Sequence, residues 1–158
     1  MQEVYSKDLI CVKPSTKKEL ALLCEIDREH FLKPWSFKNF QEEFFYPHSS
    51  IETAFYKGKI SGFIVYRIFL DELHIFRICT VKTFAGKGIA TALLKASFKN
   101  AENKAKNAFL ELSQENTIAL SFYKKNGFQL SGIRNNYYGQ GQNALNMTKD
   151  LSGGFNEY

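Results

Sequence analysis

The chain has 158 residues, of which 44% are hydrophobic, and its formal net charge is +5. This length and apolar content predict one folded domain with its own core and exclude a disordered chain. No apolar run is long enough to span a membrane, and the N-terminal residues lack the apolar core of a secretion signal, so we expect a cytoplasmic protein.

The positive charge is spread along the chain and not gathered in one block. A basic protein can bind nucleic acid, an acidic membrane surface or a polyanionic cofactor. Because no block of five or more basic residues occurs, we expect neither a nucleic-acid partner nor a membrane partner. Cys11, Cys24 and Cys79 are widely spaced and form no metal-type pair with each other or with a histidine. We therefore expect reduced thiols and no metal site.

The first part of the chain predicts a strand over residues 9–12 and then two helices. Thr16 and Glu19 have the spacing of a capping box, which predicts a helix to about residue 29. Ser36 can cap a second helix, and Pro47 ends it. The aromatic residues of this second helix recur at helical spacing and are expected in the core: Phe37, Phe40 and Phe44.

Strands and helices then alternate to the end of the chain. Residues 51–56 and 60–70 predict a hairpin through Lys57-Gly58-Lys59. Asn116 can cap a later helix that Gly127 terminates. The remaining predicted elements are strands at 73–81, 108–112, 128–133 and 144–149, and helices from about 88 and over 117–126. This order predicts an α+β domain with a mixed central sheet of about six to seven strands and about four helices.

A short glycine turn joins the strand that ends at Val81 to the next helix. In Ala85-Gly86-Lys87-Gly88-Ile89-Ala90, the backbone N–H groups at the helix start can hold a phosphate together with the helix dipole. The turn lacks the Gly-Lys-Ser/Thr ending of a P-loop, and Thr91 stands where the dinucleotide fingerprint has its third glycine. Taken alone, a pair of glycines between a strand and a helix is more often a plain tight turn.

Two polar residues after this turn are candidates for chemistry. Glu111 interrupts the apolar strand 108–112, and an unpartnered buried carboxylate is costly. It can lie at an edge in water, be satisfied by a neighbour, or line a cleft as a base with a raised pKa. Tyr123, on the helix that Asn116 caps, is either a packing aromatic or a proton donor. The Asn116 amide either caps that helix or also reaches a ligand.

Several motifs of the chain resemble the GNAT family of acyl-CoA N-acyltransferases. They are the glycine turn, Leu110-Glu111-Leu112, Asn116, Ala119-Leu120, Tyr123 and Gly127-Phe128. Pro34-Trp35-Ser36 and Arg134-Asn135-Asn136-Tyr137-Tyr138 are similar to the RimI branch, which acetylates protein N-termini and in bacteria the N-terminal alanine of a small-subunit ribosomal protein. The resemblance covers residues 9–150, and it implies a GNAT-like domain at 1–151 with a flexible tail at 152–158.

The resemblance implies acetyl-CoA as the co-substrate and assigns its contacts. The backbone of Cys79, Thr80 and Val81 would pair with the pantetheine arm, and an N–H near Val81 would polarise the thioester carbonyl. The pyrophosphate would lie on Gly86, Lys87, Gly88, Ile89, Ala90 and Thr91, with Asn116 nearby. The family prefers Arg or Gln three positions before Gly88, where this chain has Ala85. Because the phosphate contacts are mostly backbone N–H groups, we expect cofactor binding to survive.

The resemblance also implies the catalytic and acceptor residues. Glu111 would remove a proton from the acceptor amine, directly or through water, and Tyr123 would protonate the departing thiolate. Trp35, Tyr137 and Tyr138 would shape the peptide slot, although core packing is an equal alternative for Trp35. We therefore expect an acetyl-CoA-dependent protein N-terminal acetyltransferase. The alternatives are a GNAT enzyme for a small amine or a lysine side chain, and a non-catalytic basic binding module.

Overall fold

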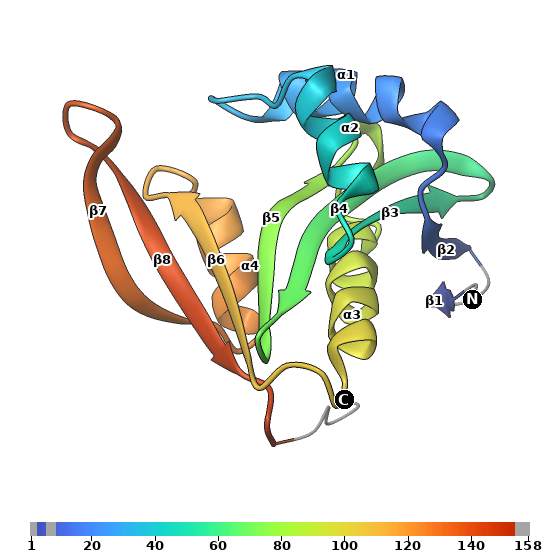
Figure 1. Cartoon of the computed structure of the whole chain (residues 1–158). Coiled ribbons are helices and arrows are strands. Elements are labelled where there is room, and N and C mark those ends of the chain that lie inside the picture. The colour runs from blue at the N-terminus through green and yellow to red at the C-terminus, as the bar shows by residue number, and fades with distance from the viewer. Residues whose placement is uncertain (1–2, 6–8, 154–158) are drawn as a thin grey trace.

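The computed structural model describes residues 3–5 and 9–153, and most of them belong to regular elements (Figure 1). The strands are β1 (Glu3–Tyr5), β2 (Ile10–Pro14), β3 (Ser49–Tyr56), β4 (Lys59–Phe69), β5 (Glu72–Thr80), β6 (Asn107–Ser113), β7 (Gln129–Gly139) and β8 (Gln142–Asp150). The helices are α1 (Leu20–His30), α2 (Phe37–Phe45), α3 (Ile89–Ala101) and α4 (Thr117–Lys125), with short 3₁₀ turns at Lys17–Glu19 and Lys82–Phe84.

Within the described residues, the strands form one sheet in the order β1-β2-β3-β4-β5-β6-β8-β7. Neighbouring strands are antiparallel, except that β5 and β6 run parallel. The predicted α+β fold with a mixed sheet is confirmed. The structure adds β1, which the sequence did not predict, and extends the strand predicted over 128–133 to Gly139. The predicted tail falls largely on residues 154–158, which lie outside the described residues.

Local sequence signals account for the ends of the elements. The Asn39 N–H donates to Ser36 Oγ at 3.2 Å, and the Ala119 N–H donates to Asn116 Oδ1 at 3.1 Å, so these two predicted N-caps are confirmed. The predicted hairpin turns through Lys57 and Gly58, whose φ angles of 49° and 79° fit the two-residue turn that matches strand twist. No helix of the described chain has the length and apolar character needed to cross a membrane.

The central strand β4 separates two apolar clusters, which explains its nearly continuous apolar sequence. Ile64 and Tyr66 point into the larger cluster with α3, and Phe63 and Val65 point into a second cluster with α1 and α2. All four side chains have 0% exposure. Because successive residues of a strand face opposite sides, one strand anchors the helices on both faces of the sheet.

Strands β5 and β6 pair over only part of their length. Their parallel register ends at Ile75 opposite Leu110. On the other side of β5, Val65 pairs with Arg77 and Tyr66 with Ile75, so Phe76 is an extra residue in a β-bulge. A bulge bends its strand and increases the local twist. Beyond it β5 and β6 separate, as Figure 1 shows, and the candidate site lies between them.

Candidate active site

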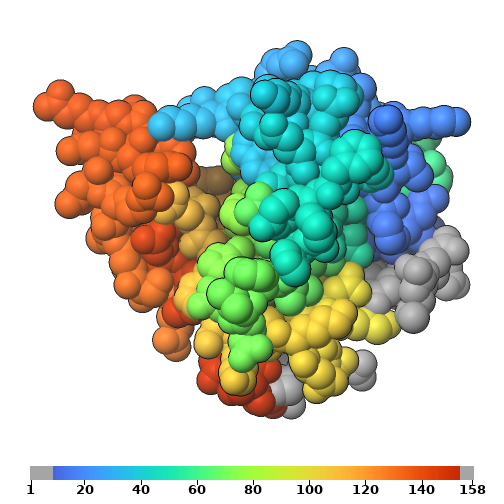
Figure 2. Space-filling view, viewed as in Figure 1, coloured from blue at the N-terminus to red at the C-terminus, as the bar shows by residue number. Residues whose placement is uncertain are grey.

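A cavity of about 670 Å³ lies where β5 and β6 separate. Its walls are residues 75–80 of β5, residues 110–113 of β6, part of α4, and the segment that follows α1. Figure 2 shows the surface hollowed between that segment and the β7–β8 hairpin. The volume is in the range of small-molecule sites. Among the described residues, no group of three or more His, Cys, Asp or Glu side chains is placed to bind a metal ion.

The two residues predicted to carry chemistry both line this cavity. Glu111 lies on β6 with its side chain 25% exposed, and Arg134 Nη1 lies 3.2 Å from its Oε1 and 3.1 Å from its Oε2. Of the alternatives for Glu111, satisfaction by a neighbour is confirmed, and the residue also lines the cleft. Arg134 belongs to a motif noted in the sequence, but its contact with Glu111 was not predicted.

Tyr123 lies on α4 and is 5% exposed. Its ring packs against Phe122 and Phe128 with centroids 5.3 Å and 5.6 Å away. Burial raises the pKa of its phenol well above the ordinary value, because the charged form loses its hydration. Tyr123 thus keeps its proton over the physiological pH range while one side of the residue lines the cavity. Both predicted roles of Tyr123, packing and proton donation, are compatible with this placement.

The glycine turn presents backbone N–H groups beside the cavity and not within it. Gly86 and Gly88 have φ angles of 75° and 85°, and α3 begins directly after them. The Ala92 N–H bonds back to the Gly88 carbonyl at 3.0 Å, so the N–H groups of residues 89–91 precede the first helical bond. Of this turn, Ala90 lines the cavity. A Cβ on Gly86 would meet nothing within 4 Å, so packing does not require a glycine at this position. The positive φ angle, or the close approach of a ligand, does.

The end of β5 supplies the cavity wall next to this turn. Cys79 and Thr80 line it, as does Asn116 at the start of α4. The Val81 N–H donates to the Ser61 carbonyl at 2.9 Å, so this N–H is not available for the thioester. Because alternate residues of a strand direct their N–H groups to opposite sides, the Thr80 N–H faces away from β4. Burial raises the pKa of the Cys79 thiol to about 12.

The residues predicted to shape the peptide slot lie in two places. Tyr138 lines the cavity, and the ring of Tyr137 lies 4.9 Å from it. Lys33 Nζ donates to the Tyr137 carbonyl at 3.0 Å and lies 4.8 Å from that ring, so it connects the segment after α1 to β7. Trp35 is not among the described residues that line the cavity. It packs against Phe40 and Phe76, with centroids 5.5 Å and 6.3 Å away, which favours its packing alternative.

Comparisons with known proteins find one family model, related sequences and similar structures. The model of the acetyltransferase (GNAT) family matches residues 20–128. A [ribosomal protein bS18]-alanine N-acetyltransferase of Haemophilus influenzae is 35% identical over 133 residues, which cover 79% of this chain and 88% of that protein. An N-alpha-acetyltransferase of Sulfurisphaera tokodaii is 29% identical over 133 residues, covering 72% and 80%. The crystal structure of the ribosomal-protein-S18-alanine N-acetyltransferase from Escherichia coli superposes with a TM-score of 0.83 at 24% identity and covers 95% of this chain and 99% of that one.

Proposed function

This chain belongs to the acetyltransferase (GNAT) family, and from that premise we propose that it transfers an acetyl group from acetyl-CoA to the N-terminal α-amine of a protein. The observation that carries the proposal is the meeting of Glu111 and Tyr123 in one cavity at the separation of β5 and β6. The names of the Haemophilus influenzae and Sulfurisphaera tokodaii relatives describe α-amine acetylation by those proteins, which supports the same acceptor here.

The chemistry requires one proton acceptor and one proton donor. A protein α-amine has a pKa of roughly 7.7 to 8.0, so much of it is protonated at neutral pH and cannot attack a thioester. Glu111 accepts that proton, directly or through water. The N–C bond then forms as the C–S bond breaks. The sulfur takes a proton from Tyr123, the proton lost by the new amide nitrogen restores the Tyr123 hydroxyl through water, and Glu111 releases its proton to solvent. Proximity and orientation of the two substrates supply most of the acceleration.

Acetyl-CoA fits the end of β5 and the adjacent glycine turn by its chemistry. The N–H groups of Gly86 and of Gly88 to Thr91 hold the pyrophosphate at the start of α3. The Lys87 N–H donates to the Phe84 carbonyl at 3.3 Å, so Lys87 contributes the charge of its side chain. The backbone of β5 up to Thr80 pairs with the pantetheine arm, because the N–H and the carbonyl of Val81 are bonded to Ser61 and Phe84. The Thr80 N–H is the candidate donor to the thioester carbonyl. The side-chain oxygen of Asn116 already accepts from the Ala119 N–H. Because Asn116 lines the cavity, it would also lie near the bound acetyl-CoA.

The acceptor that we propose is the N-terminal alanine of a small-subunit ribosomal protein, by similarity to the Haemophilus influenzae relative. The peptide would enter between Tyr138 and the segment after α1, next to the hydrogen bond from Lys33 to the Tyr137 carbonyl. Trp35 would act on this slot through Phe76, which it packs against and which lines the cavity, without contacting the peptide.

A panel of acceptors incubated with acetyl-CoA tests the proposal. The panel contains a peptide that begins Ala-Arg, the same sequence with a blocked N-terminus and an internal lysine, and a polyamine. We expect release of free CoA with the first peptide at a rate well above the other two. Preferential reaction with the lysine peptide or the polyamine would contradict the proposed acceptor, and the absence of any CoA binding in calorimetry would contradict the enzyme itself.

A further inference from the structure

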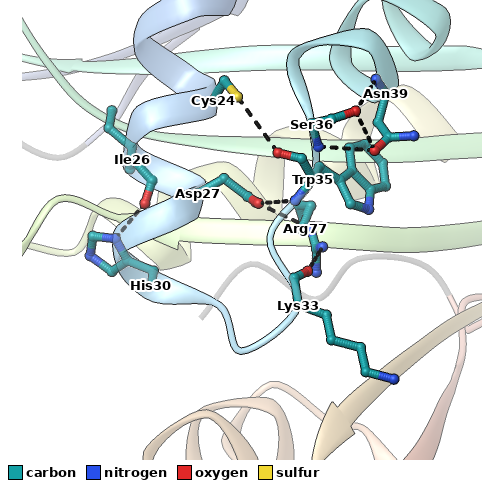
Figure 3. Close-up of polar contacts among 9 residues, drawn as sticks. All are labelled: Cys24, Ile26, Asp27, His30, Lys33, Trp35, Ser36, Asn39 and Arg77. Atoms are coloured by element: carbon teal, nitrogen blue, oxygen red, sulfur yellow. Dashed lines mark hydrogen bonds and ion pairs between the residues drawn. The ribbon is translucent and has the colours of Figure 1, made fainter. Parts of the chain in front are cut away.

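A buried ion pair joins α1 to β5 next to the cavity. Arg77 Nε lies 3.1 Å from Asp27 Oδ1, and the two side chains are 14% and 0% exposed. Arg77 itself lines the cavity. Figure 3 shows the pair between helix α1 and the segment that contains Lys33 and Trp35. Neither residue has a role in the chemistry proposed above.

The contacts of this pair converge on residues 31–36, the acceptor loop between α1 and α2. Asp27 Oδ2 accepts a hydrogen bond from the Trp35 N–H at 2.7 Å, and Arg77 Nη2 donates to the Lys33 carbonyl at 2.7 Å. The guanidinium carbon also lies 4.3 Å from the Phe31 ring centroid and 5.0 Å from that of Trp35. The ion pair therefore binds the backbone of the acceptor loop at Lys33 and Trp35. Its guanidinium also packs against the rings of Phe31 and Trp35.

Stability alone does not account for this arrangement. Burial raises the pKa of Asp27 and lowers that of Arg77, because both charges have lost hydration. A buried ion pair can often be replaced by uncharged groups of similar volume at little cost in stability, whereas removing one partner is strongly destabilising. What uncharged side chains would not reproduce is the planar donor group that binds the Lys33 carbonyl and faces both rings.

We propose that Arg77, held in place by Asp27, is a positioning residue that fixes the acceptor loop and thereby the width of the acceptor slot. The inference rests on the proposed function, because the slot is assigned to the acceptor. From its anchored carbonyl, Lys33 extends to the Tyr137 carbonyl across the slot. A displacement of the loop therefore moves the wall that faces Tyr138. The expected effect is on acceptor binding and not on acetyl-CoA.

Two variants separate positioning from stability. Arg77→Met leaves Asp27 buried and unpaired, so we expect a lower melting temperature together with a higher KM for the peptide. In the double variant Asp27→Asn with Arg77→Met, no charge is buried, and the oxygen of the introduced amide can still accept from the Trp35 N–H. We expect this variant to regain much of the melting temperature but to keep a peptide KM about tenfold above that of the unmodified protein, with the KM for acetyl-CoA unchanged.

Trp35 provides a readout that does not depend on activity, because it is the single tryptophan of the chain. Loss of the guanidinium next to its ring is expected to increase quenching of its fluorescence by acrylamide in both variants. Arg67→Met is the matched control. Arg67 lies on the adjacent strand β4, pairs with Glu43, and is not among the described residues that line the cavity. We expect the control to change neither quenching nor the peptide KM.

The two readouts distinguish the possible failures. A double variant with normal peptide KM and normal quenching would overturn the positioning role. A protein that acetylates none of the peptides would refute the proposed function, while quenching would still decide whether Arg77 anchors the acceptor loop. A rise in the KM for acetyl-CoA equal to that for the peptide would also contradict the inference, because it would indicate a general loss of structure.

Discussion

Arg134 contacts both carboxylate oxygens of Glu111 through a single nitrogen, with Nη1 3.2 Å from Oε1 and 3.1 Å from Oε2. The two residues come from β7 and β6, which are separated in the sheet by β8. The guanidinium also lies 4.1 Å from the Tyr137 ring, so Arg134 connects the proposed base to the acceptor side of the cavity. Because the Arg134 side chain is 54% exposed, its contact orients Glu111 more than it stabilises the fold.

Replacement of Arg134 by Met is therefore expected to lower kcat by about tenfold while leaving the melting temperature nearly unchanged. Arg134→Lys keeps a charged donor but not the planar group, and we expect it to recover part of the loss.

The Glu111→Gln variant should lower kcat by about 100-fold or more. Steady-state kinetics of the double variant then test the coupling, since Arg134→Met should have little additional effect once Glu111 is gone. Fully additive losses would contradict an action of Arg134 through Glu111.

Tyr123→Phe is expected to lower kcat by about 10- to 100-fold, because the thiolate loses its proton donor while the ring keeps its packing.

The same variant is expected to change how the free energy of unfolding depends on pH. The folded protein holds the Tyr123 proton more tightly than the unfolded chain does, since burial raises its pKa. The stability due to this difference is present below about pH 10 and is lost as the pH rises further.

Urea unfolding at a series of pH values measures this effect. The free energy of unfolding should decline less steeply above about pH 10 in Tyr123→Phe than in the unmodified protein. Some decline should remain, because burial and the Glu52 charge also raise the pKa of Tyr66. Identical slopes in the two proteins would show that Tyr123 is not shielded from water as described.

The glycine turn can be tested with a pair of alanine variants that share the same backbone penalty. Gly86 and Gly58 have φ angles of 75° and 79°, and a Cβ on either residue would meet nothing within 4 Å. Each Gly→Ala change should cost about 1 kcal/mol of stability. Calorimetry with CoA should find weaker binding for Gly86→Ala alone, because only that residue lies in the proposed phosphate cradle. Equal CoA affinities would place the pyrophosphate elsewhere.

The raised pKa of Cys79 bears on whether the acetyl group passes through a covalent intermediate on the protein. With a pKa of about 12, caused mainly by burial, the thiol is protonated at neutral pH and is a poor nucleophile. We predict that acetyl-CoA alone leaves no thioester on the protein and that Cys79→Ala retains acetyl transfer. Intact-protein mass spectrometry after incubation without an acceptor checks this, and an added acetyl group on Cys79 would favour a covalent intermediate instead.

The sequence predicted most elements of the fold because their ends carry local signals. Ser36 and Asn116 cap helices, and Lys57-Gly58 turns a hairpin, through contacts that span only a few residues. Strand β1 was missed because three residues give no period to recognise. The bulge at Phe76 was missed because it depends on the register between β4 and β5, which no local pattern specifies.

The same distinction explains which site residues could be foreseen. Glu111 was conspicuous because a carboxylate interrupts an apolar strand. Asp27 carries a similar signal, since a carboxylate four residues after Leu23 falls on the buried face of α1. Its partner Arg77 lies on β5, and the packing of α1 on the sheet brings the two together. Arg134, the partner of Glu111, lies on β7, which sheet pairing through β8 brings close to β6. Such contacts cannot be derived from spacing along the chain.

The most direct test of the central claim is the position of the acetyl group on a peptide that carries both a free N-terminal alanine and an internal lysine. After incubation with acetyl-CoA, fragmentation in a mass spectrometer locates the added group. We predict acetylation of the α-amine with the lysine unmodified. Acetylation of the lysine, or equal acetylation of both amines, would contradict a protein N-terminal acetyltransferase.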